Sequence, residues 1–582
     1  MKQFKTKALT LAVAGLLSSS FSAAAMADSY TYTVLPETHS QVRASFPRNI
    51  NDSGLITLHG RFSANTEIDF DLMTDNLKGY IGLDEDFDPA TDSLTEAQYW
   101  GLVQVLADRE NANSAELRIA TDFAGTYNGQ DILFHGLLNG TDGAVSSQEK
   151  SADHAFLGLN NNNVRVGWAS APYTRFDHTY QPEPAEEGGE MPDPITLNFA
   201  EREYISRGLW FDGTNYSLIA PPEQEYLGGE AQIFAINDTN LAVGNASVAL
   251  FPAAQERVDA CIEDFTPASN RAVYTCIWNL WYGFQRESAL GGSFTANGSL
   301  YDMHAAVWQL DDQGQVISET LYPPLRERAE DDGAYWSAYA YAVNNNGIAV
   351  GQSWTYYNDV EQPGNRIKMP VVYQNGETKA ITTDEEYIWG SATAINDEDQ
   401  ATGFVIRTIQ GVRRAIGFIY DVEAETFAEL PGFFEGSSTY PNAINNQGLV
   451  VGSGEIDYTL NAERRRVGFV YDLNNPDAGF INLNDAIGCS ADYYIVSADD
   501  INEDNQILAT ALTTIEETTE EGETYTRNVY ATLKLDTAAG EVTGCSTEDE
   551  VITREGAATS PFGLITMFLI GGLITIRRLI KV

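Results

Sequence analysis

The chain has 582 residues, 43% hydrophobic and 11% aromatic, which is enough apolar material for a packed core and excludes a globally disordered protein. Its 34 Lys and Arg residues stand against 83 Asp and Glu, a formal net charge of −49. Such a surface repels nucleic acid and anionic lipid, so we exclude nucleic acid as a partner and expect a soluble exported body.

The N-terminus has the charge and hydropathy order of a secretory signal peptide. Three lysines within the first seven residues precede an apolar run, and small residues follow it. This order predicts a signal peptide over residues 1–27, with cleavage between Ala27 and Asp28. It implies the Sec machinery and signal peptidase as partners.

One short phrase recurs seven times: a small or aliphatic residue, then Asn, a polar turn, an aliphatic stretch and, in five copies, Gly. Asn and Asp hydrogen-bond their own backbone and tolerate positive φ, and Gly adopts it freely. Each copy therefore predicts a tight turn between two short strands. The turn asparagines are Asn51, Asn160, Asn237, Asn344, Asn396, Asn445 and Asn502, and the closing glycines are Gly167, Gly244, Gly351, Gly403 and Gly452.

The spacing of these turns indicates the architecture. The last four asparagines are 52, 49 and 57 residues apart; the earlier gaps are 109, 77 and 107, and two of these require insertions or degenerate repeats. About 50 residues with four short strands is the size of a β-propeller blade. We predict an all-β fold, a propeller of seven or eight blades over residues 28–550, with an open β-solenoid or paired β-domains as alternatives. No long amphipathic helix is expected outside the two termini.

A second phrase falls between the turns, an apolar strand ending in an aromatic residue, as in 304–308 (HAAVW) and 414–420 (RAIGFIY). Leu-Gly-Gly at 227–229 precedes one Asn turn, and His-Ala-Phe stands at 154–156. These phrases resemble the HAF repeat of extracellular bacterial proteins. Over nearly its whole length the chain also resembles an uncharacterised bacterial family, domain of unknown function 3466. No catalytic residues are established for that family, so the resemblance assigns none to this chain.

Four cysteines lie in the portion expected to be exported. An even number in an oxidising compartment predicts two disulfides. Proximity in the sequence favours Cys261–Cys276, which would staple a loop, and Cys489–Cys545, one of three connectivities. A zinc site is not expected, because no two cysteines form a C-x2-4-C pair.

The C-terminus carries a second targeting pattern. A small-residue linker over 551–560 leads to an apolar segment over 561–578 that ends in two arginines. The apolar run is short against the ~20 residues that a bilayer core requires, and its basic end would stay cytoplasmic. The pattern resembles GlyGly-CTERM sorting tails, which implies removal by a rhomboid-type protease, type II secretion and a surface or extracellular protein. The alternative is a permanent inner-membrane anchor that holds the body in the periplasm.

Motifs for catalysis and cofactor binding are missing from the sequence. No H-E-x-x-H, G-x-S-x-G or P-loop pattern occurs, so we assign no catalytic residue, metal ligand or cofactor. The acidic runs 84–88 and 397–399 do not match a calcium loop and are interpreted as solvated; calcium, if bound, would be structural. Residues 181–194 are predicted to form an exposed loop, and residues 516–523 the tip of a long acidic hairpin.

We therefore predict an exported non-enzymatic binding or scaffold protein of the bacterial envelope, whose propeller faces contact a protein or polysaccharide. One alternative is a secreted hydrolase of glycans or esters with carboxylates in the central channel. Another is a purely structural surface-layer or adhesion component. Inward-facing Asp or Glu side chains with raised pKa at one mouth of the channel would favour the hydrolase.

Overall fold

The structure is a computed structural model. It describes residues 29–540 apart from gaps at 39–40, 65–74, 84–86, 89–90, 108–118, 139–150, 185–188, 266–268, 291–297, 363, 460–463, 491 and 519–523. The predicted signal peptide, its cleavage site, the linker and the C-terminal segment lie outside the described residues. Within the described ranges, no helix combines the length and the apolar character needed to cross a membrane.

Seven four-stranded antiparallel sheets form the body of the protein, and each is one blade. Blades 1 to 3 are β2 (Val42–Ile50), β3 (Ile56–Ser63), β4 (Asp122–Tyr127), β5 (Ile132–Phe134); β6 (His154–Leu159), β7 (Arg165–Ala169), β10 (Arg207–Phe211), β11 (Tyr216–Ile219); and β12 (Ala231–Ile236), β13 (Leu241–Leu250), β14 (Tyr301–Leu310), β15 (Val316–Tyr322).

Blades 4 to 6 follow the same order without large additions. They are β16 (Ala338–Val343), β17 (Ala349–Tyr356), β18 (Arg366–Gln374), β19 (Glu377–Ala380); β20 (Trp389–Ile395), β21 (Gln400–Ile409), β22 (Val412–Asp421), β23 (Thr426–Glu429); and β24 (Thr439–Ile444), β25 (Leu449–Glu455), β26 (Arg466–Asp472), β27 (Ile481–Asn482). Short helical turns η2 (Tyr357–Asp359), η3 (Pro476–Ala478) and α5 (Leu483–Ala486) lie in connections.

Blade 7 joins the two ends of the described chain. It contains β28 (Tyr494–Ile501), β29 (Ile507–Thr518) and β30 (Thr524–Ala538), and its outer strand is the N-terminal β1 (Ser29–Val34). β1 pairs antiparallel with β30, from Ser29 opposite Ala538 to Val34 opposite Leu533. The first strands of successive blades contact one another, and β28 contacts β2. The circle is thus closed, which protects strand edges and confirms a β-propeller with seven blades.

The recurrent Asn turns join the first and second strands of every blade. The residue three positions after each asparagine has a left-handed backbone, with φ between 59° and 79°. Only Gly, Asn and Asp occupy this position, the residue types that tolerate such a conformation best. The seven residues are Gly54, Asn163, Asn240, Gly347, Asp399, Gly448 and Asn505.

The glycines that close five of the phrases lie in the second strand, where it faces an irregularity of the first. Gly244, for example, pairs with Ile233, directly before a register shift in β12. A Cβ atom on any of these five glycines would overlap a carbonyl oxygen of the first strand, such as that of Gln232 opposite Gly244. The glycine is therefore required by close backbone approach at the bulge.

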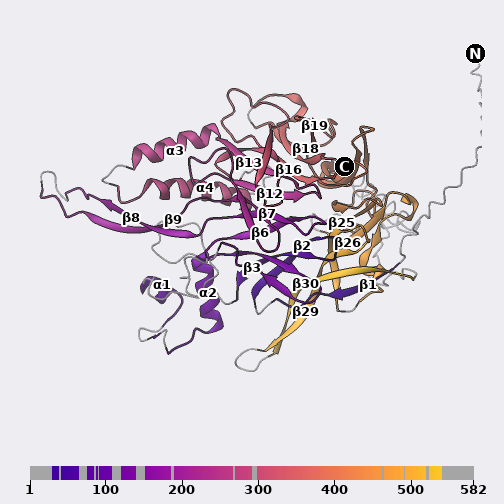
Figure 1. Cartoon of the computed structure of the whole chain (residues 1–582), viewed down its shortest axis with the longest axis horizontal. Coiled ribbons are helices and arrows are strands. Elements are labelled where there is room, and N and C mark those ends of the chain that lie inside the picture. The colour runs from indigo at the N-terminus through magenta and orange to yellow at the C-terminus, as the bar shows by residue number, and fades with distance from the viewer. Residues whose placement is uncertain are drawn as a thin grey trace, which may run out of the picture.

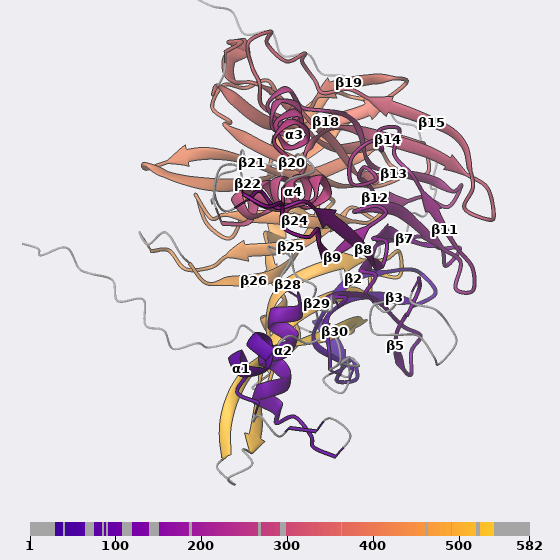
Figure 2. The ribbon, with the colours of Figure 1, turned by 90° about the vertical axis from the view of Figure 1, so that its left-hand side faces the viewer.

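Insertions account for the wide gaps between the first four turns. They are α1 (Asp75–Tyr80) and α2 (Glu96–Ala107) in blade 1, the hairpin β8 (Tyr173–Tyr180) and β9 (Ile195–Arg202) in blade 2, and α3 (Pro252–Asp264) and α4 (Val273–Leu290) in blade 3. Each joins the second and third strands of its blade, so all three lie opposite the Asn turns, on the left in Figure 1 and towards the viewer in Figure 2. We call this side the insertion face and the other the ring face.

The expectation of no long helix outside the termini was wrong. α3 buries Ala254, Val258 and Cys261, and α4 buries Trp278 and Trp281, at the three- and four-residue spacings of amphipathic helices. Pro252 occupies the first turn of α3, where its missing N–H costs nothing. The helical period was present in the sequence but lay between repeat phrases that indicated only strands.

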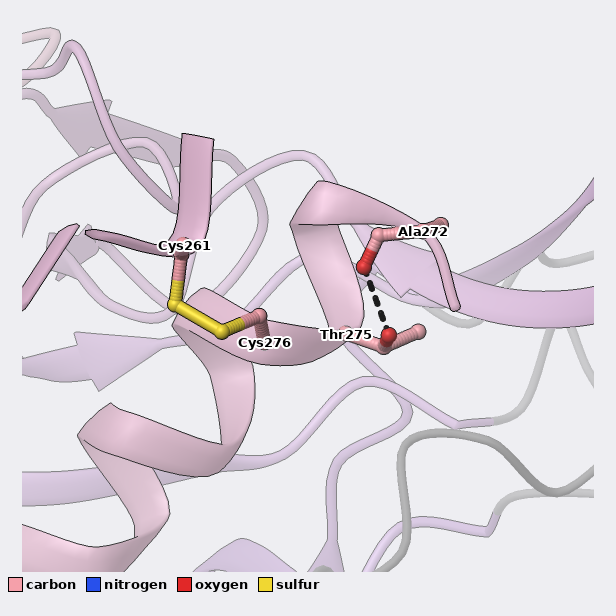
Figure 3. The surroundings of a disulfide bond; sticks show 4 residues. All are labelled: Cys261, Ala272, Thr275 and Cys276. Carbon is pink, nitrogen blue, oxygen red and sulfur yellow. Dashed lines mark hydrogen bonds between the residues drawn. A yellow bond between two sulfur atoms is a disulfide. The ribbon is translucent and has the colours of Figure 1, made fainter. Parts of the chain in front are cut away.

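The predicted disulfide between Cys261 and Cys276 is present, and it joins α3 to α4 (Figure 3). It therefore staples two helices and not a simple loop. Cys489 lies just after α5, but Cys545 is outside the described residues, so the second pairing stays a prediction.

Replacing both Cys261 and Cys276 by Ser should loosen the α3–α4 insertion without unfolding the propeller. The bond spans a sequence separation of 15 residues, and a loop of that size is stabilised by ~3 kcal/mol in the chain-entropy model. Hydrogen exchange measured by mass spectrometry should show faster exchange in peptides from α3 and α4, while peptides from β20 to β23 keep their protection. An equal loss of protection in both regions would contradict this local role.

Candidate functional site

The seven turn asparagines form a closed ring at the ring-face mouth of the channel. All seven are buried. The side-chain Nδ2 of each donates to the backbone oxygen of the turn asparagine in the next blade, at 2.9–3.2 Å. The last bond, from Asn502 to Asn51, closes the circle between blade 7 and blade 1, a junction that we call the seam. We call this set the Asn ring.

The same asparagines also hold their own turns. Each Oδ1 accepts a hydrogen bond from the backbone N–H four residues further on, at 2.9–3.0 Å. One side chain therefore satisfies a donor in its own blade and an acceptor in the next. No other residue type has a donor and an acceptor on so short a planar group, so the ring explains why Asn recurs.

A second ring is formed by the residues that follow the asparagines. The backbone N–H of each donates to the side-chain oxygen of its counterpart in the next blade, at 2.7–3.1 Å. Amides and carboxyls alternate around this circle, so two acids are neighbours only at the seam. The members are Asp52, Asn161, Asp238, Asn345, Asp397, Asn446 and Glu503. Burial, followed by the Asp52 charge, raises the pKa of Glu503.

The two rings line a polar cavity of about 350 Å³ with contributions from all seven blades. The acidic run 397–399 belongs to this structure and is not simply solvated, since Asp399 accepts from Asn344 at 2.7 Å. Among the described residues, no group of three His, Cys, Asp or Glu side chains could hold a metal ion. The polar groups of this mouth bind one another across the blades, so its main role is structural.

The pKa values of several buried or partly buried carboxyl groups are raised, and those of Glu230, Asp499 and Asp500 lie near neutrality. Burial raises the pKa of Asp500 to about 7, of Asp499 to about 6 and of Glu230 to about 7. Asp500 accepts the Ile50 N–H at 2.8 Å, a bond from blade 7 to blade 1. Asp499 accepts from Thr510 at 2.7 Å. These two lie together on β28, whereas Glu230 directly precedes β12 in blade 3.

Glu230 is covered by the α3–α4 insertion. Its Oε1 accepts from Trp281 of α4 at 3.1 Å and from Ser299 at 2.7 Å. α4 and the adjacent blade ends share one aromatic cluster that extends from Tyr173 in blade 2 to Trp389 in blade 5. The insertion is therefore part of the core of this face, and it positions Glu230 as a buried structural group.

A different kind of cavity opens on the insertion face between blades 7 and 1. Its volume is about 440 Å³, and its walls come from the β1–β2 connection, the start of β2, the end of β3 and the outer half of the β29–β30 hairpin. We call it the seam pocket. Its charged and aromatic lining residues are Arg43, Arg61, Arg527, Glu37, Phe46, Phe62, Tyr493 and Tyr530.

Neighbouring elements hold the side chains of the seam pocket. The guanidinium of Arg43 lies over the ring of Trp100 in α2, 4.8 Å from its centroid. Arg61 Nε lies 3.4 Å from Asp122 Oδ1, and the rings of Phe46 and Tyr530 are 6.0 Å apart. Phe62 has φ of 57°, a strained conformation for a bulky residue and one that concentrates at ligand sites.

The sequence predicted the seven Asn turns, and in the structure all seven lie together at one mouth of the propeller. The sequence did not predict the seam pocket, because the walls of this pocket are separated by most of the chain. Val34 and Thr532, for instance, belong to opposite ends of the described sequence and both line it. Only closure of the propeller brings these ends together, and no local motif marks the arginines.

The fold and these sites define a seven-bladed β-propeller protein with insertions on one face. The chain belongs to the family described as protein of unknown function (DUF3466), whose model matches residues 6–579. No curated protein matches the chain.

Substituting Asn445 by Leu should lower the stability of the whole propeller. The change removes the bond to Asn502 of the next blade and leaves the buried Leu449 N–H without its acceptor. A buried polar group without a partner costs about 1–3 kcal/mol, so we expect a loss of roughly 2–4 kcal/mol in urea unfolding. Asn475→Leu, at an exposed position, is the control. Equal stability of the two variants would argue against the ring.

Asp500→Asn should stabilise the protein at alkaline pH. The pKa of Asp500 is raised to about 7 in the folded state, so ionising this group costs stability as pH rises from the unfolded value of about 4 to 7. At about 1.4 kcal/mol for each pKa unit, the variant should exceed wild type by a few kcal/mol near pH 8, and the difference should shrink towards pH 4. Urea unfolding across this range measures it. Asp331→Asn, at an exposed site, should behave as wild type.

Proposed function

We propose that the protein is an exported, non-enzymatic binding protein of the bacterial cell envelope that takes its ligand on the insertion face. One observation carries this proposal: the insertions of three consecutive blades and the long hairpin of a fourth are gathered on one side of a closed, rigid scaffold. Variable connections on a rigid framework are the usual location of binding residues.

The division of roles between the two faces supports the proposal. On the ring face, the polar groups of the turns bind one another and hold the blades together. The insertion face carries a pocket that is lined by charged and aromatic side chains, and one of its arginines, Arg43, lies over Trp100 of the inserted helix α2. A protein or a polysaccharide at the cell envelope is the ligand we expect there.

Export is supported by two observations. The Cys261–Cys276 disulfide is typical of proteins that fold in an oxidising compartment. The order of charged, apolar and small residues over 1–27 is that of a signal peptide. The tail over 561–578 would either be removed by a sorting protease, which releases the protein to the surface or the medium, or anchor it with the body in the periplasm. Intact mass of the protein from each fraction distinguishes these two outcomes.

Blocking one face at a time tests the binding function. One epitope tag is inserted after Glu183, at the exposed tip between β8 and β9, and another after Gln313, in the exposed β14–β15 turn of the ring face. Binding of the tagged mature protein is measured to sacculi, outer-membrane vesicles and extracellular polysaccharide from the producing bacterium. A Fab against the first tag should abolish binding, and a Fab against the second should not.

The opposite pattern would place the ligand on the ring face and overturn the proposal. Absence of binding to all three envelope fractions would argue against a binding function altogether. Binding that neither Fab blocks would show that the insertion face is not the contact surface. The two tags serve as controls for each other, because both sites lie in exposed connections.

A hydrolase is the second candidate, favoured by the raised pKa values of Asp499 and Asp500 on β28. Glycoside hydrolysis uses a protonated carboxyl and an ionised one on either side of the scissile bond, and Asp500 is the one of the two that lines the ring-face cavity. Release of reducing ends from envelope polysaccharide by the wild-type protein, abolished in both Asp499→Asn and Asp500→Asn, would support it. Unchanged release in both variants would rule out these carboxyls.

A further inference from the structure

We propose that the seam pocket binds a saccharide unit that carries a carboxylate, a uronic acid residue at a chain end or in a short oligosaccharide. This inference rests on the proposed function, since the pocket opens on the insertion face, and it adds the chemical class of the ligand. Three properties of the pocket carry it: its charge, its aromatic walls and its size.

The charge of the pocket is opposite to that of the molecule. In the whole chain, 83 acidic residues outnumber 34 basic ones, yet the pocket is lined by three arginines and one glutamate. A guanidinium presents its donors in a planar fork that matches a carboxylate, and such charge-assisted pairs are stronger than neutral hydrogen bonds. Asp122 already pairs with Arg61, so the positive charge that selects an acidic ligand comes mainly from Arg43 and Arg527.

The remaining walls suit a sugar ring. Phe46, Phe62, Tyr493 and Tyr530 offer aromatic surface, and Tyr530 is 55% exposed. The C–H face of a pyranose packs on such rings, while Ser45, Thr513 and Asn528 supply hydroxyl and amide groups for its hydroxyls. A bare inorganic anion would use the arginines alone and leave the aromatic walls without a partner.

Size and overall charge limit how much of a ligand can enter. A cavity of about 440 Å³ lies near the lower end of the range for small-molecule sites, ~300–1,000 Å³. The net charge of −49 repels a long polyanion along its whole length. A single acidic unit placed among the arginines gains the local attraction and incurs little of that repulsion.

The pocket is held in shape before any ligand arrives. Arg43 stacks on Trp100 of α2, and Arg61 is oriented by Asp122, whose Oδ1 lies 2.8 Å from His59 Nε2. α2 itself packs on Phe62 through the cluster around Leu102 and Leu106. Groups already ordered lose little conformational entropy on binding, so this arrangement favours affinity for a matching ligand.

Titration calorimetry of the mature full chain tests the ligand class. The probes are the methyl glycosides of galacturonate, glucuronate and mannuronate, the three matching neutral methyl hexosides, and sodium sulfate. We expect at least one uronate to bind, on the order of tenfold or more tighter than its neutral partner. Arg43→Gln and Arg527→Gln should remove most of that difference, and Tyr530→Ala should weaken the uronate and its neutral partner alike.

Arg413→Gln is the matched control, an exposed arginine of β22 in blade 5 outside the pocket, and it should bind as wild type. Failure of all three uronates to bind would overturn the inference, as would sulfate binding as tightly as the best uronate or an equal loss of affinity in Arg413→Gln. If no uronate binds but the Fab against the insertion face still blocks envelope binding, the ligand class is wrong and the binding function stands. Thermal unfolding of each variant excludes loss of fold as the cause.

Discussion

The closed propeller depends on seven buried asparagine side chains, each of which hydrogen-bonds both to its own blade and to the next one. Each turn asparagine accepts a hydrogen bond from its own turn and donates to the next blade, and the seventh donates back to the first. A single bond of this kind contributes only about 1 kcal/mol net. The amides are buried, however, so a blade that is out of register leaves polar groups unpaired. The ring therefore specifies the arrangement of blades more than it adds stability.

This constraint explains the asymmetry between the two faces. The seven Asn turns on the ring face have one length and one chemistry, because each must present an asparagine to its neighbour. The connections on the insertion face carry no such requirement, and they range from the tight turn between β21 and β22 to the α3–α4 insertion. The large insertions of blades 1 to 3 all lie there, which concentrates candidate binding surface on a single side of the molecule.

The seam between blades 7 and 1 follows from closure. Blade 7 takes its outer strand from the N-terminal end, so the connection from β1 to β2 crosses the insertion face beside the β29–β30 hairpin. The other junctions between blades have no such crossing from one end of the chain to the other. The seam pocket lies at this junction, where arginines gather in a strongly acidic protein.

The sequence by itself determined the properties that are local and repeated. The turn asparagines, the residues with positive φ, the glycines at the bulges and the Cys261–Cys276 pair lie within single blades, and local backbone chemistry dictates them. The sequence did not decide between seven and eight blades, because a wide gap between turns fits an insertion and a missing repeat equally well. Helices α3 and α4 were missed where the strand pattern of the repeat outweighed a short helical period. Only the tertiary structure decided the ring and the seam pocket, because Asn502 and Asn51, 451 residues apart, meet through closure alone.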